Sequence, residues 1–256
     1  MREWWTGLSR RRRALLAAVA LPCVLALVAG AVALLVPDDQ PTRTGVGPVL
    51  LVPGYGGSRG SLSTLADRIR ATGREATVLT LPGDGTGDLR AQVKVLEDAV
   101  DDALDRGAPS VDVIGYSAGG VVARLWVDTE DGARATRRVV TLGSPLHGTR
   151  LAGVGEVLAP GACPVACQQL APGSALLAGI AGPPPVDWLS LWTRDDETVK
   201  PPDSARLPGA VNVQLQDVCP DAVVAHSQLP SDPQVTGVVL RAIGTAPLAA
   251  PTECPQ

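Results

Sequence analysis

The feature that most constrains the fold is a serine flanked by glycines at the end of an apolar run. Residues 115–119 read Gly-Tyr-Ser-Ala-Gly, after the β-branched run 111–114 and before the helix-forming run 120–126. This pattern predicts a buried strand that turns sharply into a helix, with the hydroxyl of Ser117 exposed on the turn. Glycine is expected on both sides because a larger side chain would collide with the neighbouring strand or helix. The alternative is a Gly/Ser turn in an ordinary strand–helix unit.

A serine hydroxyl becomes a good nucleophile when a base takes its proton, and that base is usually histidine. The chain contains only two histidines. His226 follows the last predicted strand, near 210–215, and is the candidate base; a solvated loop histidine is the alternative. His147 precedes every acidic candidate, so we interpret it as a structural histidine or as part of a pocket wall.

A third group should orient the imidazole and stabilise its cation. Three adjacent acids, Asp195, Asp196 and Glu197, follow the strand predicted near 187–193. They leave its carboxyl end, the edge at which open α/β sheets build their sites. We favour Asp196, with Asp195 as the reserve and Glu197 as the least favoured, although spacing alone does not separate the two aspartates.

Hydrolysis through such a serine also requires donors for the developing oxyanion. One candidate is the backbone N–H of Ala118, the residue after the serine. The other is expected in the loop 53–57, Pro-Gly-Tyr-Gly-Gly, which follows the first strand and places Tyr55 at the donor position. The same loop is a poor phosphate site because it lacks the Lys-Ser/Thr of a P-loop and the G-x-G-x-x-G spacing.

Taken together, these segments resemble those of small bacterial lipases of the α/β-hydrolase superfamily, close to the class 2 lipases with a minimal fold. The likeness spans about residues 47–244. It is carried by Val-Pro-Gly-Tyr-Gly-Gly at 52–57, Gly-Tyr-Ser-Ala-Gly-Gly at 115–120, Leu-Gly-Ser-Pro-Leu-His-Gly-Thr at 142–149, Asp196 with Val199, and His226.

The resemblance implies a catalytic triad in the chain order Ser117, Asp196, His226. It favours Asp196 over Asp195 because these lipases carry an Asp-x-x-Val element after a late strand, and it implies that Tyr55 and Ala118 form the oxyanion hole. One residue departs from the pattern, since proline stands at position 53 where these lipases have a histidine that shapes the loop. The motif at 142–149 also occurs in acyltransferase-like relatives, so it indicates the superfamily more than one substrate.

The rest of the chain alternates strands with helices. Strands are predicted near 48–53, 75–81, 111–115, 138–142, 187–193 and 210–215, and helices near 61–72, 88–106, 117–129, 168–179 and 232–243. This alternation predicts an α/β fold with a doubly wound, mainly parallel sheet of about six strands and right-handed crossovers. Because the first strand already carries the oxyanion loop, the extra antiparallel strands of larger hydrolases have no room, and a minimal α/β-hydrolase fold is expected.

The amino-terminal segment predicts where the chain is located. Four arginines at 10–13 precede an uncharged apolar run at 14–36, roughly 34 Å long as a helix and therefore able to cross a hydrocarbon core. We expect an uncleaved signal anchor in the membrane, with its basic end in the cytoplasm and the remainder extracytoplasmic. A signal peptide cleaved near 29–31, giving a secreted protein, is the alternative. The predicted regions are the basic segment and anchor (1–36), a polar linker (37–47) and a catalytic domain (48–256).

Four cysteines follow the apolar run: Cys163, Cys167, Cys219 and Cys254. An even number in an exported chain suggests two disulfides. Of the three possible pairings, short separation favours Cys163–Cys167 and Cys219–Cys254, with free buried thiols as the alternative. No metal site is expected, because the spacing and the scarcity of histidine do not suit zinc.

The formal net charge of −4 becomes more negative beyond the basic first segment, which argues against nucleic-acid binding. We therefore expect an exported monomeric serine hydrolase, a lipase or esterase that cleaves lipid or other acyl esters through an acyl-enzyme, without a cofactor. An acyltransferase or thioesterase would use the same residues, and an inactive hydrolase fold that only binds ligands is the other alternative. The segment 150–186, rich in Ala, Gly, Pro and Leu, is either the wall of an acyl pocket or a packed insertion closed by a disulfide.

Overall fold

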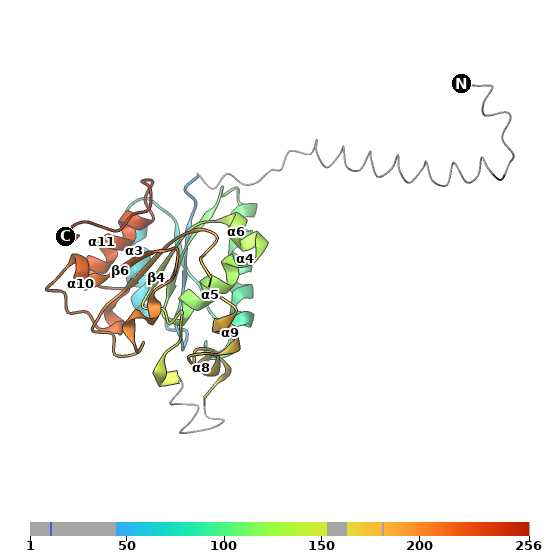
Figure 1. Ribbon diagram of the computed structural model, residues 1–256. Coiled ribbons are helices and arrows are strands. Elements are labelled where there is room, and N and C mark those ends of the chain that lie inside the picture. The colour runs from blue at the N-terminus through green and yellow to red at the C-terminus, as the bar shows by residue number, and fades with distance from the viewer. Residues whose placement is uncertain (1–10, 12–44, 153–162, 181, 256) are drawn as a thin grey trace. The chain divides into compact units, whose positions relative to one another are not determined.

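The apolar runs of the sequence form a parallel sheet of six strands (Figure 1). The structure is a computed structural model, and its described residues are 11, 45–152, 163–180 and 182–255. The chain divides into two compact units, 1–40 and 41–256, and the sheet belongs to the second. The predicted anchor at 14–36 lies outside the described residues. Among the residues that are described, no helix has the length and apolar character needed to cross a membrane.

The strands lie in the order β2-β1-β3-β4-β5-β6, and each neighbouring pair is parallel. Their bounds are β1 Val49–Val52, β2 Ala76–Val78, β3 Val111–Tyr116, β4 Thr136–Leu142, β5 Asp187–Trp192 and β6 Val211–Gln214. The predicted six-stranded α/β fold is therefore confirmed. Only β2 is much shorter than the run expected for it.

Helices connect the strands, as parallel neighbours require. They are α3 Gly60–Arg70, α4 Leu89–Asp105, α5 Ala118–Val127, α6 Glu130–Ala135, α8 Val165–Gln169, α9 Ala175–Ala178, α10 Leu215–Val218 and α11 Pro233–Ala242, with 3-10 helices at Pro202–Ala205 and His226–Gln228. The single helix predicted at 168–179 was wrong. Pro172 and Gly173 interrupt it, Gly173 with a φ of 77°, and Ser174 begins α9 by accepting the N–H of Leu177.

Both faces of the sheet are apolar and covered by helices. Leu50 and Val52 of β1 are buried in a cluster with residues of α4 and α5. Val49 and Leu51 of the same strand are buried in a second cluster with residues of α3 and α11. Figure 1 shows α3 and α11 on one side of the sheet and α4 and α5 on the other. Because successive side chains of a strand point to opposite faces, the sheet is doubly wound, as predicted.

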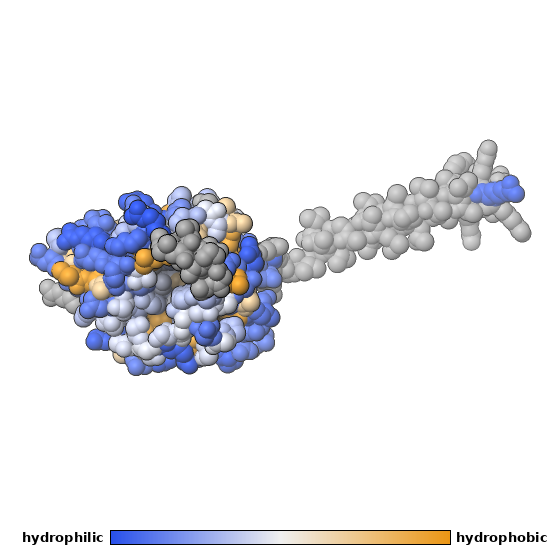
Figure 2. All heavy atoms as spheres, turned by 90° about the horizontal axis from the view of Figure 1, so that it is seen from below, coloured by the Kyte–Doolittle hydropathy of each residue, from blue (hydrophilic) through white to orange (hydrophobic). Residues whose placement is uncertain are grey.

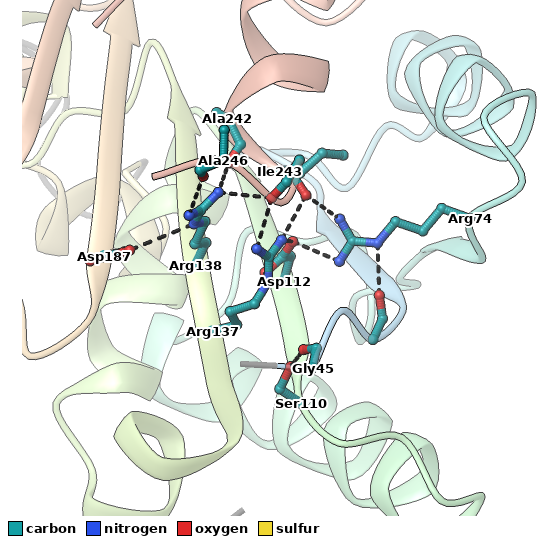
Figure 3. Close-up of polar contacts among 12 residues, drawn as sticks. Gly45, Arg74, Ser110, Asp112, Arg137, Arg138, Asp187, Ala242, Ile243 and Ala246 are labelled. Atoms are coloured by element: carbon teal, nitrogen blue, oxygen red, sulfur yellow. Dashed lines mark hydrogen bonds and ion pairs between the residues drawn. The ribbon is translucent and has the colours of Figure 1, made fainter. Parts of the chain in front are cut away.

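A charged cluster closes the edge of the sheet at which β3 and β4 begin (Figure 3). Asp112 is fully buried there and accepts hydrogen bonds from Arg74, at 2.6 Å, and from Arg137. Arg137 and Arg138 also donate to backbone carbonyls beyond the end of α11, among them that of Gly244. We call Arg74, Asp112, Arg137 and Arg138 the Asp112 cluster. It joins two central strands to the last helix, whose free carbonyl groups need donors.

Two disulfides connect the cysteines as predicted, Cys163 to Cys167 and Cys219 to Cys254. The first encloses most of α8. The second ties the residue that follows α10 to the carboxyl-terminal tail, 35 residues further along the chain. The alternative of four free thiols is excluded.

We expect Asp112→Ala to lower the free energy of unfolding by about 3–5 kcal/mol, because it leaves Arg74 and Arg137 with unpaired charges at a largely buried site. Urea-induced unfolding followed by tryptophan fluorescence measures the loss. Asp98→Ala is the matched control, since it removes an exposed ion pair to Lys94 on α4 and should cost no more than about 1 kcal/mol. Similar losses in the two variants would contradict a central role for the Asp112 cluster.

Candidate active site

Ser117 lies on a sharp turn between β3, which ends at Tyr116, and α5, which begins at Ala118. Its φ is 52° and its ψ −125°, and it is the only non-glycine residue with a positive φ in the described part of the chain. Such a conformation costs of the order of 1–3 kcal/mol and persists only where the surroundings enforce it. The N–H of Ser117 donates to the carbonyl of Leu142, at 2.9 Å, which fixes the turn to the neighbouring strand. The predicted strand–turn–helix context is therefore present.

Three glycines make this turn possible because their neighbours leave no space for a side chain. A Cβ on Gly115 would lie 2.4 Å from the Cα of Gly120, and a Cβ on Gly119 would lie 2.2 Å from the carbonyl oxygen of Val52. A Cβ on Gly120 would lie 2.0 Å from the hydroxyl oxygen of Ser144. The glycines thus allow α5 to approach β1, β3 and the loop after β4 closely, which is the steric reason inferred from the sequence.

Asp196 and His226 form a buried pair. Asp196 Oδ2 lies 2.6 Å from His226 Nδ1, and the two residues are 0% and 4% exposed. The other carboxylate oxygen of Asp196 accepts the backbone N–H groups of Thr198, at 2.8 Å, and Val199, at 2.7 Å. The carboxylate is therefore satisfied on both oxygens, and it holds the imidazole with Nδ1–H as the donor.

The two acids beside Asp196 have other partners. Asp195 accepts a hydrogen bond from the side-chain amide of Gln216, at 3.1 Å. Glu197 accepts the backbone N–H of His226, at 3.0 Å, and does not contact its ring nitrogens. The structure therefore brings together the acid and the histidine that the sequence analysis preferred, while the catalytic roles of Ser117, Asp196 and His226 stay predictions.

Tyr116 lies against His226 as well. The two ring centroids are 5.1 Å apart, and the phenolic hydroxyl donates to the backbone carbonyl of His226, at 3.2 Å. Burial raises the pKa of Tyr116 to about 12, and the negative charges of Asp196 and Glu197 add to this rise. The hydroxyl consequently stays protonated and can donate at any pH near neutrality.

The loop 53–57 lies over Ser117, as expected for an oxyanion loop. A Cβ on Gly54 would be 3.0 Å from the Cβ of Ser117, and the N–H of Gly57 donates back to the carbonyl of Gly54. The N–H of Tyr55 donates to no acceptor in the described part of the chain. Ala118, as the first residue of α5, likewise has no intrahelical acceptor for its N–H. Both groups are therefore free to donate, and their oxyanion role stays a prediction.

A pocket of about 230 Å³ opens beside Ser117. Its walls are largely apolar, and its lining residues are Tyr55, Ser117, Pro145, Thr149, Leu151, Ala152, Cys167, Leu170, Thr198 and Val199. Figure 2 looks at the molecule from below, the side on which α8 lies in Figure 1, and shows apolar side chains scattered among polar ones.

A larger cavity, of about 760 Å³, is lined by Arg137 and Arg138 of the Asp112 cluster and not by Ser117. Since their donors are already largely used by the protein, we do not assign a reaction to it.

Both expectations for the segment 150–186 are met in part. Leu151, Cys167 and Leu170 line the pocket beside Ser117, whereas Leu176 and Leu177 are buried in the core cluster of α4 and α5. Three apolar residues of the segment, Val154, Val157 and Leu158, lie outside the described residues. The segment therefore contributes both a pocket wall and core packing.

The sequence motif at 142–149 supports the Asp196–His226 pair in a way that the sequence analysis missed. Gly143 has a φ of 55°, and a Cβ there would lie 3.1 Å from both Asp196 Oδ2 and His226 Nδ1. Thr149 donates its hydroxyl to the carbonyl of Thr198, at 2.9 Å, which ties the motif to the turn that carries Asp196. The signal in the sequence for this support of the Asp196–His226 pair is the Gly-Ser-Pro at 143–145 within the motif.

His147 has a structural contact, as we interpreted it. It is exposed, its Nδ1 lies 3.1 Å from the backbone carbonyl of Ser204, and it does not line the pocket beside Ser117. Within the described residues, no group of three or more His, Cys, Asp or Glu side chains is arranged to hold a metal ion.

We expect Asp196→Asn to slow covalent labelling of Ser117 by an organophosphonate probe about 10³–10⁴-fold, because His226 loses the acceptor that fixes its tautomer. The labelling rate, followed by intact mass, measures this effect. Asp195→Asn is the matched control, since it changes a neighbouring carboxylate that bonds Gln216 instead of His226. An equally large decrease in the labelling rate of Asp195→Asn would contradict the assignment of Asp196 as the acid that holds His226.

The raised pKa of Tyr116 predicts how stability depends on pH. Below about pH 10 the phenol is protonated in the folded and in the unfolded chain, so its contribution to stability is complete. Between about pH 10 and 12 the unfolded chain loses a proton that the folded chain retains, so the free energy of unfolding falls as the pH rises. Urea unfolding at pH 9 and pH 11 should show a smaller decrease for Tyr116→Phe than for the wild type. Equal decreases would contradict the raised pKa.

The comparisons with known proteins agree with this architecture. The family model of palmitoyl protein thioesterases matches residues 48–174, just under half of the chain, and this stretch includes the serine turn. No curated protein sequence matches the chain at a significant level.

Solved structures share the fold at low sequence identity. Lipase B of Aspergillus fumigatus is 18% identical, with a TM-score of 0.64 over 81% of this chain and 54% of that chain. This chain thus spans about half the length of that lipase. The mature form of the Bacillus licheniformis lipase BlEst2 is 18% identical, with a TM-score of 0.55 over 66% of this chain and 83% of that chain.

A third structure is MGS-MChE2, an alpha/beta hydrolase enzyme from the metagenome of sediments of the Mar Chica lagoon in Morocco. It is 16% identical, with a TM-score of 0.53 over 77% of this chain and 90% of that chain. The comparisons support the coarse prediction of a hydrolase of the lipase, esterase or thioesterase type. The chain has the fold of the α/β-hydrolase superfamily, as its motifs predicted, and within that superfamily it is similar to palmitoyl protein thioesterases and to lipases.

Proposed function

We propose that this protein hydrolyses carboxylic esters of acyl chains by a Ser117–His226–Asp196 triad. The observation that carries the proposal is the buried Asp196–His226 pair, with 2.6 Å between carboxylate and imidazole, at the same edge of the sheet as the strained turn of Ser117. A buried carboxylate that accepts Nδ1–H leaves Nε2 as the basic nitrogen of the ring. That is the protonation state a general base needs.

In the proposed mechanism, Ser117 Oγ attacks the ester carbonyl while His226 Nε2 takes its proton. Asp196 holds the ring and stabilises the imidazolium, and the N–H groups of Tyr55 and Ala118 bind the oxyanion. His226 then gives the proton to the departing alcohol, which leaves an acyl ester on Ser117. Water, activated by the same histidine, attacks this acyl-enzyme and releases the acid.

The pocket beside Ser117 supports an apolar acyl group as the part of the substrate that is bound. Leu151, Leu170 and Val199 contribute aliphatic walls. The volume of about 230 Å³ is below the range of about 300–1,000 Å³ that is usual for ligand pockets. We therefore propose short and medium acyl chains as the preferred substrates.

A thioesterase is the second candidate, and the match of residues 48–174 to the palmitoyl protein thioesterase family favours it. A thioester carbonyl would enter the same oxyanion site and be attacked by the same serine, so the triad does not distinguish the two. An acyltransferase would differ in the acceptor that attacks the acyl-enzyme, and an inactive binding module would lack the attack itself.

We propose that the catalytic domain is extracytoplasmic and anchored by residues 14–36. Two disulfides, Cys163–Cys167 and Cys219–Cys254, support an oxidising compartment, because such bonds are rare in the cytoplasm. The full chain should remain in carbonate-washed membranes, whereas a chain beginning at Pro41 should not. Recovery of an intact full chain in the soluble fraction would reject the anchor.

Turnover of p-nitrophenyl esters of two to sixteen carbons, beside thioesters of the same acyl groups, tests the function. We expect the highest kcat/KM at short to medium chain length, and a loss of at least about 10³-fold in Ser117→Ala and in His226→Ala. A preference for thioesters of long chains would favour the thioesterase. If folded wild-type protein shows neither turnover nor probe labelling, the remaining candidate is an inactive hydrolase fold that only binds ligands.

A further inference from the structure

The main chain of His226 is held from two sides by the direct neighbours of Ser117 and Asp196. Tyr116, which precedes Ser117, donates its hydroxyl to the carbonyl of His226, at 3.2 Å. Glu197, which follows Asp196, accepts the N–H of His226, at 3.0 Å. We infer that Glu197 and Tyr116 are positioning residues, which fix the backbone of the catalytic base while Asp196 fixes its ring. This inference rests on the proposed function.

Glu197 satisfies a donor that the local fold leaves free. His226 begins the 3-10 helix 226–228, and the first N–H groups of a helix have no acceptor within it. The Glu197 carboxylate accepts that N–H in place of water, although the side chain comes from a turn 29 residues earlier. A charge-assisted hydrogen bond of this kind is stronger than one between neutral groups. Asp196 and Glu197, adjacent on one turn, therefore hold the ring and the backbone of one residue.

Tyr116 connects the base to the nucleophile. It is the last residue of β3, so its position is set by the hydrogen bonds of a central strand. Its ring, 5.1 Å from the imidazole, limits how far His226 can turn toward it. Its hydroxyl remains a donor because burial raises the pKa of Tyr116 to about 12. Movement of the His226 loop away from Ser117 would therefore break contacts to both the N–H and the carbonyl of this one residue.

Glu197 also adds a negative charge beside the base. The titratable groups that face His226 are Asp196 and Glu197 from the turn after β5 and the phenol of Tyr116 from β3. Gly143 and Leu229, which pack on the same side, bring no charge. The Glu197 carboxylate should favour the imidazolium that forms during attack. Glutamine at this position would keep an acceptor oxygen but remove that charge.

The test compares Glu197→Ala, Glu197→Gln and Tyr116→Phe by steady-state kinetics with the ester on which the wild type is most active. We expect kcat to fall about 10-fold in Glu197→Ala and in Tyr116→Phe with KM within about 2-fold, because misplacement of a catalytic group lowers the rate more than binding. Glu197→Gln should recover most of kcat, because glutamine keeps an acceptor oxygen for the N–H of His226. The double variant Glu197→Ala/Tyr116→Phe should lose less than the product of the single losses, because both residues hold the main chain of His226.

Asp195→Asn is the matched control, because it removes a carboxylate from the same turn that bonds Gln216 and not His226. Its kcat and its pH–rate profile should equal those of the wild type. Wild-type kcat in Glu197→Ala and Tyr116→Phe would overturn the inference. So would a Glu197→Gln variant that loses as much kcat as Glu197→Ala, or multiplicative losses in the double variant.

A spectroscopic readout separates failure of this inference from failure of the proposed function. A proton in the 2.6 Å hydrogen bond between His226 Nδ1 and Asp196 should give a far-downfield NMR signal, and the chain has only one other histidine, His147. The signal should broaden by faster exchange in Glu197→Ala and persist in Glu197→Gln and Asp195→Asn. This holds whether or not the protein turns over an ester. An unchanged signal in Glu197→Ala would overturn the inference, while an inactive wild type with the expected signals would overturn only the proposed function.

Discussion

The buried carboxylate of Asp196 is the interaction on which the arrangement of the candidate site depends. A fully buried charge is costly unless each oxygen has partners. Asp196 meets this requirement with two backbone N–H groups of its own turn on one oxygen and the imidazole of His226 on the other. The backbone bonds fix the turn, and the ring bond sets the tautomer of the histidine. The remaining site residues act around this pair, because Gly143 makes space for it and Thr149 ties the turn to the loop after β4.

Ser117 is held on its turn in a strained backbone conformation. Its positive φ is held by a hydrogen bond to Leu142 and by the close packing of Gly115, Gly119 and Gly120. The energy stored in one unfavourable residue is small beside the burial of the surrounding strands and helices, so the core can enforce it. The serine therefore stays on a rigid turn between a central strand and α5, and this is where a nucleophile should be fixed.

The sequence predicted the parts of the site that local patterns encode, and it missed those that depend on contacts between distant segments. The six-stranded parallel sheet, the serine turn, both disulfides and the choice of Asp196 followed from alternation, glycine spacing, separation of cysteines and the resemblance to lipases. Glu197, by contrast, contacts His226 across 29 residues, and Tyr116 contacts His226 across 110 residues. No periodicity or spacing rule encodes these contacts. The sequence therefore placed Glu197 last among the three adjacent acids and predicted no separate role for it. The helix expected at 168–179 is broken for a local reason, because Pro172 and Gly173 interrupt it.

The two edges of the sheet differ in the donors that they leave free for a ligand, and this difference favours the edge at which the proposed site lies. In the Asp112 cluster, the carboxylate accepts from Arg74 and Arg137, and the guanidinium groups donate to carbonyls beyond α11. Among the described residues, Arg138 Nε has no hydrogen-bond partner, and it lies 3.6 Å from Asp187 Oδ2. The other contacts leave these groups little capacity for a ligand, although a larger cavity adjoins them. At the opposite edge, the N–H of Tyr55 has no acceptor within the described residues, and Ala118 begins a helix with its N–H free. In the proposed mechanism, a substrate oxygen that arrives during the reaction would accept from these two N–H groups. The proposed function therefore rests on the free N–H groups beside Ser117 more than on cavity volume.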